Sequence, residues 1–215
     1  MHNVSTGMTA PQTPAGYSRP TRFDYSSLLL AVLSTIMLVI SAVEFGAILW
    51  YFQGKPEEIS VGITITSGSD FLALFAGIGV FIGTLLVHEA IHGLVSRLLG
   101  YRVSYGFEPR IPALYTAAFG QFVTRRDNML VGVAPLVVIT LVGIPLLAGP
   151  MPVALAAYFA LLVNTSGAVG DLYLLWRLWR LPPETMLYDT DIRHSYVFEP
   201  ASDTAIGVGK LVENR

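Results

Sequence analysis

Four long apolar segments restrict what this chain can fold into. They run from about 27 to 52, 71 to 99, 129 to 148 and 153 to 178. Roughly 20 apolar residues in a helix cross the hydrocarbon core of a bilayer, so each segment is long enough to span it. Only 13% of the residues are charged, whereas a typical soluble protein has about 25%. We therefore predict an all-α membrane protein with four transmembrane helices.

The basic residues predict how these helices are oriented. Arg19 and Arg22 precede the first span, and the loop between the second and third spans is rich in arginine, whereas the other two connections offer only Lys55. Because cytoplasmic loops carry an excess of Lys and Arg, both termini and the long loop should be cytoplasmic. The net charge of −2 gives no reason to expect nucleic-acid binding.

Three regions follow from this reading. Residues 1–26 are rich in Pro, Ser, Thr and Gly and predict a disordered cytoplasmic N-terminus. Residues 27–180 form the four-span membrane domain, and residues 181–215 form a cytoplasmic C-terminal tail. Within the long loop, aromatic and β-branched runs broken by Pro109 and Pro112 predict a small β-hairpin or re-entrant loop on the cytoplasmic side.

The second apolar segment contains the sequence His88-Glu89-Ala90-Ile91-His92. A helix places residues i and i+4 on one face, so both imidazoles can bind one zinc ion. The glutamate between them is placed to act as general base on a water bound to that zinc. The chain has no cysteine, so any further metal ligand must be His, Asp or Glu.

Two acids in other spans could supply the third zinc ligand, Glu44 and Asp171. Asp171 and the two histidines lie at similar depths below the cytoplasmic ends of their spans, whereas Glu44 lies near the outer end of its own. We therefore expect Asp171 to be the ligand. Glu44 should be structural, or should line a path for water or substrate.

A polar residue and two small residues lie near these ligands in sequence. Asn164 precedes Asp171 by two helical turns and shares its face, so its amide could bind substrate backbone or an oxyanion, or could make an interhelical hydrogen bond. Gly79 and Gly83 on the second span should allow helices to approach closely.

The HExxH motif in one span, with Asn and Asp two spans later, resembles the site-2 proteases, which are intramembrane zinc metalloproteases. The chain more closely resembles a family of membrane zincin peptidases. The residues that carry this resemblance are the motif with Gly93, the Tyr115-Thr116 region, Ala134-Pro135 and Gly170-Asp171. The chain lacks the proline and the glycine that usually accompany the second motif of site-2 proteases. The resemblance implies Zn²⁺ at His88, His92 and Asp171, with Glu89 as the catalytic base in a site facing the cytoplasm.

These features together predict an intramembrane zinc metallo-endopeptidase in a prokaryotic plasma membrane. Its partners would be the lipid bilayer and a transmembrane or membrane-proximal protein substrate. Two alternatives remain open at this point. One is a catalytically inactive membrane scaffold or chaperone that retains the protease fold, and the other is an ion or proton transporter that uses the same intramembrane His, Glu and Asp.

Overall fold

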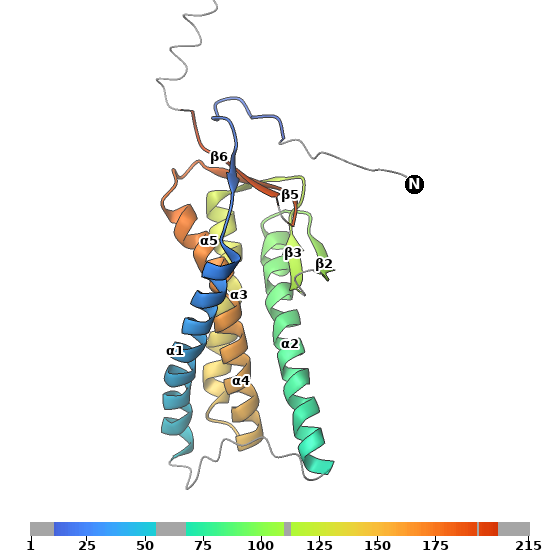
Figure 1. Cartoon of the computed structure of the whole chain (residues 1–215), viewed down its shortest axis with the longest axis vertical. Coiled ribbons are helices and arrows are strands. Elements are labelled where there is room, and N and C mark those ends of the chain that lie inside the picture. The colour runs from blue at the N-terminus through green and yellow to red at the C-terminus, as the bar shows by residue number, and fades with distance from the viewer. Residues whose placement is uncertain (1–10, 55–67, 110–112, 193, 202–215) are drawn as a thin grey trace, which may run out of the picture.

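Helices make up most of the computed structural model, and the strands gather at one end of them (Figure 1). The model describes residues 11–54, 68–109, 113–192 and 194–201. The helices are α1 (Ser27–Gln53), α2 (Gly68–Leu98), α3 (Arg125–Leu146), α4 (Met151–Gly167) and α5 (Val169–Trp179). The strands are β1 (Thr21–Phe23), β2 (Ser104–Glu108), β3 (Ala113–Ala117), β4 (Phe122–Thr124), β5 (Met186–Asp191) and β6 (His194–Phe198).

Three of these helices are each long and apolar enough to cross a membrane, namely α1, α3 and the part of α2 from Phe71. Helices α4 and α5 meet the same criteria only when taken together as one bent span, with an angle of 42° between them. By length and composition, the described residues therefore offer three or four spans. Many large apolar side chains of these helices are exposed on the surface of the protein, as expected for helices that lipid would surround.

The bend falls between the two predicted functional positions of the fourth apolar segment. Helix α4 ends at Gly167 and α5 begins at Val169, with Ala168 at the junction. Just before it, the Ser166 hydroxyl donates back to the carbonyl of Leu162 at 2.7 Å, a bond of the kind that often bends helices. The sequence predicted one continuous helix here, and the bend instead gives Asn164 and Asp171 different helix axes.

Helix α4 is contacted by α1, α2 and α3. Helix α1 contacts α4 and α5, while α2 contacts α3 and α4. One buried cluster joins α1 to α4 through Phe45, Ala157 and Leu161, with Leu147 beside them. Helix α3 also contacts α5, which places α5 between α1 on one side and α3 on the other.

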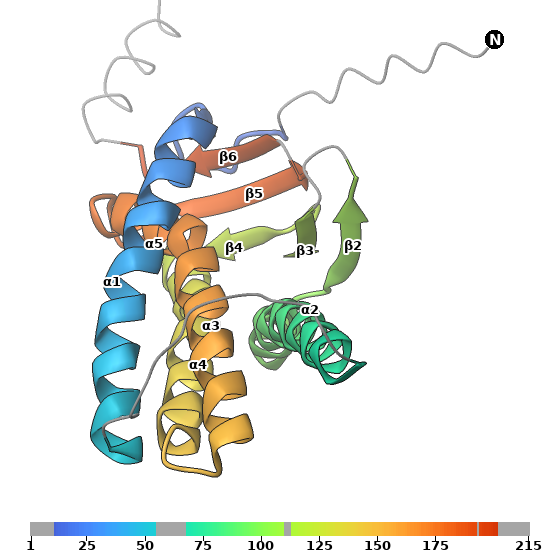
Figure 2. The same cartoon turned by 60° about the horizontal axis from the view of Figure 1, so that its bottom comes forward.

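Two antiparallel sheets cover the end of the bundle where α2 and α5 finish (Figures 1 and 2). Strands β2 and β3 form the hairpin expected in the long loop, and β3 lies against α2. The second sheet, with strand order β1-β6-β5-β4, did not follow from the sequence. It draws on residues 21–23, which lie in the segment expected to be disordered, and on the C-terminal tail. The two expectations also cover residues 1–10 and 202–215, which lie outside the described part.

Apolar packing explains why these polar segments form a sheet. Phe23 of β1, Leu187 of β5 and Val197 of β6 bury their side chains together with Leu178 of α5. The sheet thereby holds the two ends of the described chain and α5 against each other. It is also continuous with α3, because β4 ends at Thr124, whose hydroxyl accepts a hydrogen bond from the Asp127 amide and caps α3.

Candidate metal centre

The two histidines of the HExxH motif face the interior of the bundle from α2. They lie one helical turn apart, and their Nε2 atoms are 3.1 Å from each other. Both are buried, with 9% of His88 and 8% of His92 exposed. The Glu89 carboxylate stands beside them, and one ligand atom from each of these three residues lies within 4.8 Å of the others. The helical spacing thus brings together the residues that the motif predicted.

Asp171 approaches the same point from α5. Its Oδ2 atom lies 3.3 Å from Nε2 of His88 and 3.4 Å from Nε2 of His92. In a tetrahedral zinc site with bonds of about 2.0–2.1 Å, neighbouring ligand atoms are about 3.3–3.4 Å apart. The triangle formed by the two Nε2 atoms and Oδ2 therefore has the size that three zinc ligands require. Glu44, the other acid considered, is exposed on α1.

The second nitrogen of each imidazole has its own acceptor. Nδ1 of His88 donates to Oδ1 of Asn164 at 2.9 Å, and Nδ1 of His92 donates to the main-chain carbonyl of Val131 at 2.9 Å. A carbonyl can only accept, so the proton of His92 lies on Nδ1 and the Nε2 lone pair is left free. The contact with Oδ1 of Asn164 is consistent with the same tautomer in His88, because an amide oxygen also accepts and Nδ1 must then carry the proton. Two lone pairs and a carboxylate then converge on one point, and this donor set suits a cation such as Zn²⁺.

The carbonyl of Val131 is available because of a proline. In α3 the N–H of residue 135 would normally donate to the carbonyl of residue 131, but residue 135 is Pro135, which has no N–H. Pro135 is buried inside the helix rather than at its first turn, where proline is usually tolerated. Helix α3 therefore lacks one main-chain hydrogen bond, and Nδ1 of His92 donates to the carbonyl that would have accepted it.

Asn164 is buried beside His88 and contacts it with one atom of its amide. Only 1% of it is exposed, and its Oδ1 is occupied by His88. Its Nδ2 is buried without a hydrogen-bond partner in the described part of the chain. The amide thus orients the His88 ring with one atom and keeps a donor beside the site with the other.

Glycines on α3, rather than on α2, permit the closest approach of neighbouring helices. A Cβ added at Gly132 would lie 2.6 Å from Cδ1 of Leu175 and 3.9 Å from Cβ of Asp171. Gly79 and Gly83, which the sequence suggested for this purpose, have no atom within 4 Å of an added Cβ. Gly132 therefore allows α5 to bring Asp171 close to α3 and to the histidines.

The β2–β3 hairpin is attached to α2 at the motif itself. The hydroxyl of Thr116 on β3 donates to the main-chain carbonyl of Glu89 at 3.0 Å. On β2, the Tyr105 ring occupies the space that a side chain at Gly93 would need. Gly93 directly follows the motif, so its lack of a side chain lets the hairpin lie against the helix. The sequence predicted the hairpin but not these attachments.

A further contact connects the end of α2 to the start of α3. The hydroxyl of Tyr101 donates to the carboxylate of Asp127 at 2.6 Å. Burial raises the pKa of Tyr101, and the hydrogen bond to Asp127 raises it further, so the phenol stays protonated and remains a donor. The two helices that carry His92 and its acceptor are thus fixed relative to each other at this end.

Comparison with known proteins gives one match. A family model described as "Putative zincin peptidase" matches residues 81–186, just under half of the chain. The matched region includes His88, Glu89 and His92, and it extends through α3, α4 and α5 to Asp171. No curated protein and no solved structure gave a significant match. The match supports a zincin-like metallopeptidase, a class in which the metal is zinc.

Proposed function

We propose that this protein is an intramembrane zinc metallo-endopeptidase that hydrolyses peptide bonds of membrane proteins in or near the bilayer. One observation carries the proposal: two Nε2 atoms and one carboxylate oxygen form a triangle with edges of 3.1–3.4 Å, while both Nδ1 atoms have acceptors of their own. His88, His92 and Asp171 would hold the zinc. The family match supports the metallopeptidase class.

The chemistry requires few groups beyond these ligands. When bound there, zinc would supply Lewis-acid chemistry, lowering the pKa of a water towards about 7 and polarising a substrate carbonyl. The Glu89 carboxylate takes a proton from the attacking water and delivers it to the departing amine. Asn164 keeps His88 in the tautomer that offers Nε2, and its unpaired Nδ2 is our candidate donor to a substrate carbonyl.

The depth of the site favours action within the bilayer. His88 lies ten residues before the end of α2 at Leu98, and Asp171 lies eight residues before the end of α5 at Trp179. At about 1.5 Å per residue, these positions are about 15 and 12 Å from the end of the bundle that carries the sheets. A hydrocarbon core about 30 Å thick would enclose both. We place the sheets in the cytoplasm of a prokaryotic cell, on the side indicated by the arginines.

The substrate would be a transmembrane or membrane-proximal segment in extended form, because a helix hides its peptide bonds. The β2–β3 sheet has only two strands, so the outer edge of each can pair with another strand. Strand β3 is the better candidate, since Thr116 connects it directly to the main chain of Glu89. A substrate strand added there would lie beside the general base.

Zinc content and cleavage, measured in parallel, test this proposal. Full-length protein and single-span membrane proteins would be reconstituted together in liposomes, and products would be identified by mass spectrometry. We expect Glu89→Gln to retain zinc and lose cleavage, and His88→Ala to lose both. Asp171→Ala should lose most of the zinc. Glu44→Gln, a matched change at an exposed acid on α1, should retain both zinc and cleavage.

Three outcomes would refute the proposal. Purified wild-type protein that contains no zinc would exclude the proposed metal centre. Cellular function that survives Glu89→Gln would indicate the scaffold or chaperone. Ion flux through the liposomes without peptide cleavage would indicate the transporter.

A further inference from the structure

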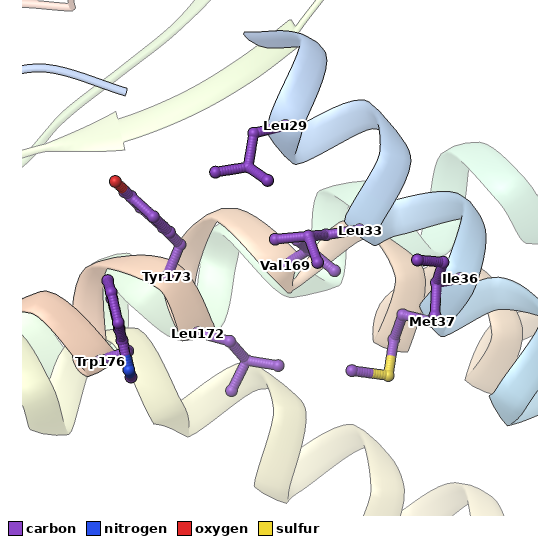
Figure 3. Close-up of a pocket in the computed structure, with 8 residues that line it drawn as sticks. All are labelled: Leu29, Leu33, Ile36, Met37, Val169, Leu172, Tyr173 and Trp176. Carbon is purple, nitrogen blue, oxygen red and sulfur yellow. The ribbon is translucent and has the colours of Figure 1, made fainter. Parts of the chain in front are cut away.

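An apolar groove lies between α1 and α5 (Figure 3). Its volume is about 350 Å³. Helix α1 contributes side chains from its first three turns, and these are Leu29, Leu33, Ile36 and Met37. Helix α5 contributes one face at helical spacing, formed by Val169, Leu172, Tyr173 and Trp176. No acidic side chain lines the groove.

The groove has the length of one membrane leaflet. The part of α1 from Leu29 to Met37 covers nine residues, whose eight steps of about 1.5 Å give a length of about 12 Å. Half of a hydrocarbon core of about 30 Å is about 15 Å. An extended hydrocarbon chain can lie along this length between the two helices.

Two arginines stand at the end of the groove nearest the sheet. The guanidinium of Arg180 lies 4.0 Å above the ring of Trp176, and Arg177 donates to the hydroxyl of Tyr173 at 3.1 Å. Trp176 and Tyr173 are the two aromatic side chains that line the groove. Among the described residues, no carboxylate pairs with either arginine. Two cationic groups with no paired carboxylate in the described part of the chain therefore lie next to the aromatic side chains at this end of the groove.

We propose that this groove binds one anionic phospholipid from the leaflet on the side of the sheets. The acyl chain lies along Leu33 and Leu172, and the phosphate lies between Arg177 and Arg180, which bind it through charge-assisted hydrogen bonds. The proposal depends on the helices spanning a membrane but not on peptidase activity. It separates the lipid from the metal centre, because Asp171 lies on another face of α5, toward α2 and α3.

Lipid retention by the purified full-length protein tests the site. Native mass spectrometry in detergent would compare phosphatidylglycerol with phosphatidylcholine of the same acyl chains. Both lipids offer a phosphate, but the choline ammonium of phosphatidylcholine would face two arginines, so we expect one phosphatidylglycerol to bind about tenfold more tightly. Arg177→Gln with Arg180→Gln should remove this preference. Arg97→Gln should not, although Arg97 also lies over an aromatic ring, 5.3 Å from the centre of Tyr105 on the other side of the bundle.

The apolar part of the site has its own test. Leu33→Trp fills the groove and should weaken binding of both lipids. Val32→Trp, at an exposed position on α1 that does not line the groove, should leave binding unchanged. Equal binding of the two lipids by wild-type protein, or a preference that survives loss of both arginines, would overturn the proposal. Displacement of the lipid by an apolar transmembrane peptide would assign the groove to a helix instead.

Discussion

Replacing Pro135 with alanine should make the protein more stable and its metal centre weaker. An alanine at this position restores an N–H that competes with Nδ1 of His92 for the carbonyl of Val131. Proline in a helix interior costs about 3 kcal/mol relative to alanine, which sets the upper limit of the gain in stability. The loss of a hydrogen bond behind a metal ligand typically lowers metal affinity 10–100-fold, or about 1.4–2.7 kcal/mol.

We expect the lower end of that range for Pro135→Ala. A carbonyl oxygen has two lone pairs, so Val131 can still accept a weakened bond from His92 while it accepts from the restored main-chain N–H. Zinc affinity should therefore fall about tenfold, as measured by competition with a chelator. In the zinc-free protein, the ¹⁵N chemical shifts of His92 should show that the Nδ1-protonated tautomer is less populated. The midpoint of thermal unfolding without zinc should rise.

A second proline in the same helix provides the control. Pro145 also lies inside α3, and its missing N–H leaves the carbonyl of Leu141 without a helical donor. No histidine uses that carbonyl among the described residues. Pro145→Ala should therefore raise stability and leave zinc affinity unchanged. Unchanged zinc affinity and an unchanged His92 tautomer in Pro135→Ala, with the same gain in stability, would refute the reasoning, because the carbonyl would then serve both donors equally.

Three further changes probe other parts of the fold. Asn164→Leu leaves the buried Nδ1–H of His88 without an acceptor and should weaken zinc binding about 10–100-fold in the chelator assay, whereas Asn164→Asp keeps an acceptor and should retain binding. Burial raises the pKa of Asp189, so folding binds a proton and stability should increase as pH falls through that pKa towards the unfolded value near 3.9; Asp189→Asn should remove this part of the pH dependence of thermal unfolding. Gly132→Val forces its side chain against Leu175 and should cost about 1–3 kcal/mol in thermal unfolding while lowering zinc affinity.

The sequence predicted the helices well because the relevant signals are local. Apolar runs of about 20 residues define α1, α2 and α3, and the 3.6-residue period places His88 and His92 on one face. Counting residues from the arginine-rich ends also selected Asp171 over Glu44, and the structure brings Asp171 to both imidazoles. None of these inferences needed a contact between distant segments.

The four-stranded sheet could not be predicted from local sequence signals. Its strands are three to six residues long, and β1 and β5 contain charged residues, so neither length nor alternation distinguishes them from loops. The pairing of Arg22 with Tyr196 joins residues at opposite ends of the described chain. Short strands of this kind are stabilised by partners that only the folded chain supplies, here α5 through Leu178.

The acceptor for His92 was not predicted, but part of its signal is present in the sequence. A main-chain carbonyl belongs to every residue and therefore carries no side-chain signature. A proline inside a predicted transmembrane helix is different, because it identifies the carbonyl four residues earlier as one without its helical donor. An unpaired carbonyl in an apolar setting is costly, so some donor must reach it. The sequence of α3 thus identifies two such carbonyls, at Val131 and Leu141. Which of them serves the metal centre depends on the packing of α2 against α3, and that is information that only the folded protein provides.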